Sequence, residues 1–167
     1  LILDSVSNAG DVNGDGFDDL IVGGRKFDTN GEVVHTASYV VFGKASGFSA
    51  TFELSGLNGS NGFRLESSLD DELFRSRDIS VSNAGDVNGD GFDDLIVGVP
   101  GADTNGTRSG SSYVVFGKAS GFSATLDLSS LDGIDGFRLD GEIAGDGFGG
   151  SISNAGDVNG DGFDDLI

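Results

Sequence analysis

The chain has 167 residues and is strongly acidic, with 9 Lys and Arg against 28 Asp and Glu, one His and no Cys. The lack of cysteine excludes disulfides, thiolate zinc sites and cysteine catalysis, and a single histidine excludes a multi-histidine metal centre. The formal charge of −19 argues against nucleic acid and anionic membrane surfaces as partners. No apolar run approaches the ~20 residues that a membrane-spanning helix needs, so we expect no membrane insertion in this segment.

Internal repetition is the strongest signal in the sequence. The motif SVSNAGDVNGDGFDDLIVG at residues 5–23 returns unchanged at 80–98, and SISNAGDVNGDGFDDLI follows at 151–167. Repetition of this kind is typical of repeat architectures, in which each repeat is one structural unit. We therefore divide the chain into a first unit at 1–79, a second at 80–150 and the start of a third at 151–167. Since the third copy stops inside the motif, we expect a fragment of a larger protein.

The apolar segments of the first unit are short, rich in Val, Ile, Phe and Tyr, and separated by Gly, Asn, Asp and Ser. This pattern favours strands and turns over helices. In chain order the predicted strands are Ser5–Ala9, Leu20–Val22, Tyr39–Phe42, Thr51–Leu54 and Phe63–Leu65. About four strands per unit correspond to one propeller blade, whose faces must be covered by neighbouring blades. We expect an all-β fold, a partial β-propeller with about two four-stranded blades and the start of a third.

Each unit carries the acidic loop D-V-N-G-D-G-F-D-D, in which oxygen side chains occupy positions 1, 3, 5 and 9. Calcium takes six to eight oxygen ligands, and Gly16 permits a sharp turn that directs the Phe17 carbonyl inward. The loop is not an EF-hand, because an EF-hand would place Glu at position 12, where Val22 stands. Calcium is preferred to magnesium, because magnesium demands tighter geometry and usually keeps its waters. The metal-free alternative is a β-turn rich in Asn and Asp, but three copies favour about one calcium ion per loop.

The eighth loop position is also an aspartate in every copy, namely Asp18, Asp93 and Asp164. We expect these side chains to point away from the ion. Their predicted role is turn hydrogen bonding, or support of the ligands from outside the coordination sphere.

Two strings resemble FG-GAP repeats, the blades of the N-terminal β-propeller of integrin α-subunits, which also occur in bacterial secreted and surface proteins. They are FGGSISNAGDVNGDGFDDLI at 148–167 and SVSNAGDVNGDGFDDLIVGVPGAD at 80–103. The resemblance implies a calcium loop between two adjacent strands of a blade, with ligands at positions 1, 3, 5, 7 and 9, the seventh through its backbone carbonyl. The implied ligands are Asp11, Asn13, Asp15, Phe17 and Asp19; Asp86, Asn88, Asp90, Phe92 and Asp94; and Asp157, Asn159, Asp161, Phe163 and Asp165. The motif departs from the family pattern at Phe74-Arg75-Ser76 and Gly23-Gly24-Arg25, outside these loops.

We expect no enzymatic activity and no catalytic residues. His35 is a lone histidine, for which a surface position is expected, and a catalytic carboxylate pair would be unique rather than copied in every unit. The units differ mainly between residues 24–37 and 99–111, and between 66–79 and 140–150. We expect these variable segments to be surface loops, which are the usual carriers of partner specificity.

The resemblance implies a structural and interaction module for adhesion-like recognition of a protein or other extracellular macromolecule. It implies an extracellular or cell-surface location. One alternative is a non-catalytic propeller appended to a secreted hydrolase or phospholipase, and another is a purely structural array. The open strand edges of a partial propeller would also favour self-association.

Overall fold

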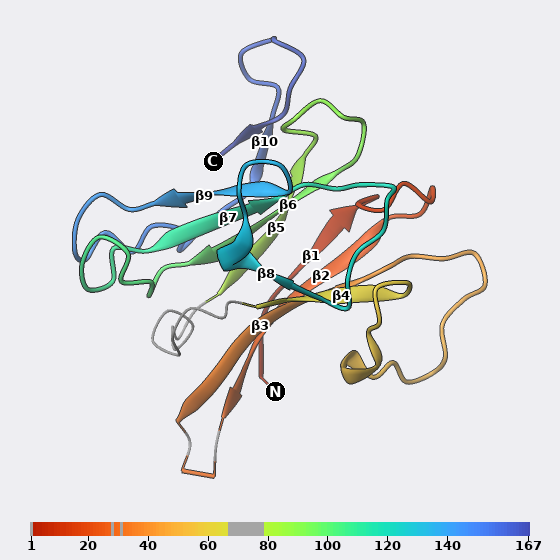
Figure 1. The fold of residues 1–167 in the computed structure, drawn as a ribbon, viewed down its shortest axis with the longest axis horizontal. Helices are drawn as coiled ribbons and strands as arrows, with labels where there is room; N and C mark the ends of the chain where they lie inside the picture. The colour runs from red at the N-terminus through yellow and green to blue at the C-terminus, as the bar shows by residue number, and fades with distance from the viewer. Residues whose placement is uncertain (1, 28, 31, 67–78) are drawn as a thin grey trace.

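A computed structural model describes residues 2–27, 29–30, 32–66 and 79–167 (Figure 1). These residues form a nearly all-β structure with two short 3-10 helices, η1 (Leu54–Gly56) and η2 (Leu128–Ser130). The departure from the family pattern at Phe74-Arg75-Ser76 lies outside the described residues, as does most of the variable segment 66–79.

The first sheet contains four consecutive antiparallel strands and a fifth strand contributed by the second unit. Its strands are β1 (Ile2–Gly10), β2 (Asp19–Phe27), β3 (Val33–Val41), β4 (Gly62–Glu66) and β8 (Thr125–Asp127). Strand β8 pairs in parallel with β4, so that Leu126 lies opposite Leu65. The second unit therefore supplies an edge strand to the sheet of the first.

The second sheet repeats the antiparallel order, and a strand pair begins the third. The second sheet contains β5 (Ser80–Gly85), β6 (Asp94–Val99), β7 (Ser111–Val115) and β9 (Gly136–Asp140). The third consists of β10 (Asn154–Gly156) and β11 (Asp165–Leu166). The first strands of successive units are neighbours, because β5 contacts β1 on one side and β10 on the other (Figure 1). This is the arrangement of a partial β-propeller, as the sequence predicted.

Strand β6 of the second sheet is apolar on both faces because neighbouring units cover both. Side chains alternate between the two faces of a strand. Along β6, Leu95 and Val97 join the core shared with the first sheet, whereas Ile96 joins a cluster shared with the third unit. Every residue of β6 is buried as a result. Neighbouring units thus supply the burial that a single blade cannot obtain by itself.

The predicted strand Thr51–Leu54 is wrong. Residues 51–53 are irregular and η1 follows from Leu54. The corresponding segment of the second unit does form a strand, β8, but it pairs with the preceding unit. The segment in the first unit follows no earlier unit within the described residues, so it has no such strand to pair with.

The prediction that residues 24–37 form a surface loop is also largely wrong. Strands β2 and β3 extend into this segment as a long hairpin, in which Gly24 lies opposite Ala37 and Arg25 opposite Thr36. An ion pair between Arg25 and Asp4 (2.5 Å) links β2 to β1. In the second unit, by contrast, residues 100–110 form turns and isolated bridges. The variable segments therefore differ in secondary structure as well as in sequence.

Candidate metal centre

The three acidic loops connect the first and second strands of each unit, between β1 and β2, β5 and β6, and β10 and β11. The first strand of each pair ends at a glycine with a left-handed backbone: Gly10 (φ +71°), Gly85 (φ +73°) and Gly156 (φ +69°). Only glycine adopts this conformation without steric cost, so the Asn-Ala-Gly sequence sets the turn into the loop. In the first unit, the N–H of Gly10 donates to Oδ1 of Asn8 (2.9 Å), which fixes the turn.

The side chains at loop positions 1, 3 and 5 fold back onto the loop backbone. In the first loop, Oδ1 of Asp11 accepts from the N–H of Asp15 (3.0 Å), and Oδ2 accepts from the N–H of Gly16 (2.8 Å). The Asn13 side chain accepts from the same Asp15 N–H (2.9 Å), and Asp15 accepts from the N–H of Phe17 (3.0 Å). These bonds hold the side chains at positions 1, 3 and 5 against the loop backbone.

The second and third loops repeat this pattern. The first-position carboxylates accept from the same two loop N–H groups: Asp86 from Asp90 (3.0 Å) and Gly91 (2.9 Å), and Asp157 from Asp161 (3.1 Å) and Gly162 (2.9 Å). The N–H of Gly162, the strongest of several loop donors, helps to hold the pKa of Asp157 below its usual value. The backbone therefore favours the charged form of this carboxylate.

The ninth-position aspartates of the first two loops are buried, and they tie each loop to the sheet. Asp19 accepts from the N–H of Val12 (3.1 Å) and from that of Gly43 (2.8 Å), which follows β3. Asp94 accepts in the same way from Val87 (3.0 Å) and Gly117 (2.9 Å). Asp165 is half-buried and accepts from Val158 (2.9 Å).

Burial raises the pKa of Asp19 to about 7, against the opposing effect of its two N–H donors. The charges of Asp15 and Asp11 contribute to the same upward shift. Asp94 shows the same behaviour, with burial again the largest cause of a pKa of about 7. A buried carboxylate beside two others is disfavoured in its charged form, and a bound divalent cation would reverse that preference.

The donor chemistry of the loops fits a hard cation, because every predicted ligand offers oxygen. Each carboxylate retains lone pairs beyond those used by the N–H donors. In the part of the chain that the structure describes, however, no three Asp, Glu, His or Cys side chains converge closely enough to hold a metal ion. The predicted ligands of each loop therefore lie on one strand connection, but their carboxylates do not form a ready-made metal site in the described residues.

The seventh-position phenylalanines have a packing role that the sequence did not predict. A Cβ atom placed on Gly14 would lie 2.3 Å from the Phe92 ring, and one placed on Gly89 would lie 2.3 Å from the Phe163 ring. Each ring therefore lies directly over the fourth loop position of the preceding unit. The carbonyl-ligand role of these phenylalanines stays a prediction.

Asp93 and Asp164, at the eighth loop position, make contacts between units that the sequence did not predict. The carboxylate of Asp93 accepts from the N–H of Asp11, and that of Asp164 accepts from the N–H of Asp86. Both bonds cross from one unit to the loop of the preceding unit. The signal in the sequence was an acidic residue repeated at a position from which the side chain is expected to point away from the ion.

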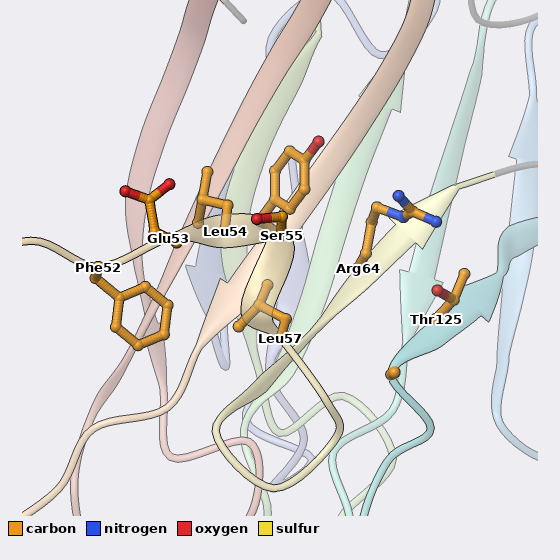
Figure 2. Close-up of a pocket in the computed structure, with 9 residues that line it drawn as sticks. Phe52, Glu53, Leu54, Ser55, Leu57, Arg64 and Thr125 are labelled. Carbon is orange, nitrogen blue, oxygen red and sulfur yellow. The ribbon is translucent and has the colours of Figure 1, made fainter.

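A cavity of about 510 Å³ lies beside β4, at the seam between the first unit and the second-unit strand β8. Figure 2 shows the side chains that line it. It is lined by Tyr39, Phe52, Glu53, Leu54, Ser55, Leu57, Arg64, Ala124 and Thr125. Arg64 forms an ion pair with Glu66 (3.0 Å), and the lining residues lie outside the variable segments. The cavity therefore belongs to the seam between the units, and no residue of the acidic loops lines it.

Helices long and apolar enough to cross a membrane are not found among the described residues.

Comparison with known proteins agrees with the repeats seen in the fold. The family model described as "FG-GAP repeat" matches residues 4–35 and 79–115, which span the first two acidic loops. The chain is 30% identical over 162 residues to "Integrin alpha-4" of Xenopus laevis and to "Integrin alpha-PS5" of Drosophila melanogaster. These alignments cover 95% of this chain but only 13% and 14% of the two relatives. The chain therefore contains FG-GAP repeats and resembles integrin α-subunits over nearly its whole length.

Proposed function

We propose that the chain is a calcium-stabilised set of propeller blades that acts as an interaction module of an extracellular or cell-surface protein. The observation that carries the calcium part is the burial of Asp19 and Asp94 beside further loop carboxylates. Desolvated carboxylates in a group need a compensating positive charge to remain ionised. The family resemblance supports the same assignment.

In each loop the side chains at positions 1, 3, 5 and 9 and the carbonyl at position 7 would hold the ion. A bound calcium ion supplies positive charge that offsets the repulsion between the carboxylates. The protein's own contribution is positional. Backbone N–H groups orient the first-position carboxylate, and the ninth-position carboxylate links the loop to the sheet through Gly43 or Gly117. Calcium would therefore stabilise the folded blades, since an unfolded loop lacks this geometry.

Thermal unfolding in EDTA and across a calcium titration tests this proposal. At a calcium concentration 100 times the dissociation constant, one site adds about 2.7 kcal/mol of stability. In a chain of this size that corresponds to a rise in Tm of about 5–10 °C per site. Asp94→Asn should lose part of the rise, whereas Glu142→Gln, on an exposed residue outside the loops, should keep all of it. A Tm that does not change across the calcium titration would refute the proposal that the loops bind calcium.

The interaction part of the proposal rests on the variable turn at residues 100–110. Arg108 lies there with φ +56°, the one left-handed non-glycine among the described residues, and its N–H donates to Asp103 (2.6 Å). An exposed basic residue with a left-handed backbone on a strongly acidic protein is a reason to infer function. We therefore assign partner contact to this turn. The partner is a protein or other extracellular macromolecule that presents acidic groups.

Arg108→Gly tests this assignment without threatening the fold, because glycine accepts the left-handed backbone. We expect the variant to keep its Tm and to lose binding to an immobilised extracellular-matrix extract. Asp132→Asn, in an exposed turn of the same unit, serves as the control. Unchanged binding by Arg108→Gly would remove the turn from the interface.

A further inference from the structure

Asp93 and Asp164 connect the first and second acidic loops to the units that follow them. Oδ2 of Asp93 accepts from the backbone N–H of Asp11 (2.8 Å), 82 residues earlier in the chain. Oδ2 of Asp164 accepts from the N–H of Asp86 (3.0 Å), 78 residues earlier. The same contact thus occurs at both junctions between units, always from the later unit to the first residue of the earlier loop.

The glycine that precedes each loop makes room for this contact. A Cβ atom on Gly10 would lie 2.3 Å from Cγ and Oδ2 of Asp93, and one on Gly85 would lie 2.0 Å from Oδ2 of Asp164. Gly156 has the same left-handed backbone but would meet nothing within 4 Å. The close approach is therefore a property of the junctions and is separate from the turn itself.

We propose that Asp93 and Asp164 are positioning residues that couple each acidic loop to the docking of the next unit. The bond from Asp93 fixes Asp11, whose two carboxylate oxygens receive the N–H groups of Asp15 and Gly16 and so organise the loop. A unit that docks correctly stabilises the loop before it. By linkage, a cation in that loop strengthens the docking of the next unit to the same extent. The cation part of this inference rests on the proposed function.

The first unit contains a natural control for this contact. Asp18 occupies the same place as Asp93 in an identical stretch of sequence, residues 5–23 against 80–98. No loop precedes it in the described part of the chain. Its Oδ2 instead accepts from Asn8 of its own unit at 3.4 Å. A substitution at Asp18 therefore removes the same chemical group without removing a bond between units.

Amide exchange measured by NMR in EDTA tests the contact independently of calcium. Removal of a hydrogen bond to a carboxylate should speed exchange of the Asp11 amide by about tenfold or more in Asp93→Ala. Asp18→Ala should leave that amide unchanged. Asp93→Asn keeps the shape of the side chain and an acceptor oxygen, so it should restore most of the protection. Equal exchange of the Asp11 amide in Asp93→Ala and Asp18→Ala would overturn the proposal.

A calcium titration followed at the Gly16 amide tests the coupling. We expect Asp93→Ala to weaken calcium binding at the first loop by about tenfold, since the same hydrogen bond is lost. Asp93→Asn, which loses the same charge but keeps an acceptor oxygen for the Asp11 N–H, should weaken it much less. Calcium binding that is equal in the two variants would overturn the coupling. If neither variant nor the wild-type chain binds calcium, the proposed function fails, and the exchange experiment still decides whether Asp93 positions the loop.

A second pair of variants covers the case in which Asp93→Ala does not fold. Gly85→Ala and Gly156→Ala impose the same left-handed backbone cost, but only Gly85→Ala pushes against Asp164. We expect faster exchange of the Asp86 amide in Gly85→Ala and normal exchange in Gly156→Ala. Equal exchange of the Asp86 amide in these two variants would contradict the proposal.

Discussion

The packing of Phe92 and Phe163 on the preceding loops gives a specific prediction about stability. Gly89 and Gly160 occupy the same loop position and share a left-handed backbone, with φ of +74° and +80°. The difference between them is the neighbour. A Cβ on Gly89 would lie 2.3 Å from the Phe163 ring, whereas a Cβ on Gly160 would meet nothing within 4 Å. Substitution by alanine at the two positions therefore separates the backbone cost from the packing cost.

The expected magnitudes follow from these two costs. Both variants place alanine in a left-handed backbone, at about 1–2 kcal/mol. Gly89→Ala must also displace the phenylalanine ring, and overpacking of this kind costs about 1–3 kcal/mol. In a chain of this size each 1 kcal/mol lowers Tm by about 2–4 °C. We expect Gly89→Ala to melt several degrees below Gly160→Ala.

The assay is thermal unfolding followed by circular dichroism, with calcium and in EDTA, on both variants and the wild-type chain. Phe163→Ala combined with Gly89→Ala should remove the additional cost, because the space occupied by the ring becomes available. Equal melting temperatures for Gly89→Ala and Gly160→Ala would refute the argument that the ring packs on the preceding loop.

Three further predictions concern burial, pH and cation choice. Leu95→Ala should lower the free energy of unfolding by about 2–5 kcal/mol, since Leu95 is 1% exposed. Leu20→Ala at the equivalent place should lower it by about 0.5 kcal/mol, since Leu20 is 43% exposed. Urea unfolding of the two variants measures the difference. In EDTA, stability should fall as pH rises from about 4 to about 7, because the pKa values of Asp19 and Asp94 are raised in the fold and the unfolded chain is deprotonated first. With solvent screening we expect each of the two carboxylates to lower the free energy of unfolding by about 1–2 kcal/mol over this pH range. A stability that is flat or rising with pH between 4 and 7 in EDTA would contradict the raised pKa values of Asp19 and Asp94. Magnesium should raise Tm much less than calcium does, and equal effects of the two ions in the same titration would argue against calcium-selective loops.

Much of the fold was predictable because the determining information is local and repeated. Short strands separated by Gly, Asn and Asp, and copied at a fixed spacing, predicted the all-β propeller architecture. The loop positions of Asp11, Asn13 and Asp15 were likewise visible, since alternate oxygen side chains in a tight turn are a local pattern. Their calcium-binding role stays a prediction that the titrations test.

The errors and omissions arose where the outcome depends on a neighbouring unit. The segment Thr51–Leu54 and its counterpart in β8 have similar sequences, but only β8 has an earlier sheet edge with which to pair. The hydrogen-bond partner of Asp93 was not predicted for the same reason, since its acceptor oxygen meets a backbone N–H 82 residues away. Neither contact can be derived from the residues next to it in sequence.

The sequence by itself determined the repeat, the strand-and-turn character and the acidic loops, because these depend on residue types within a few positions of one another. The tertiary structure decided what identical residues do. Leu20 and Leu95 lie in identical stretches of sequence, yet the first is 43% exposed and the second 1%. Burial depends on which surface lies opposite a side chain, and the surface opposite Leu95 belongs to a unit that is distant in sequence and adjacent in space.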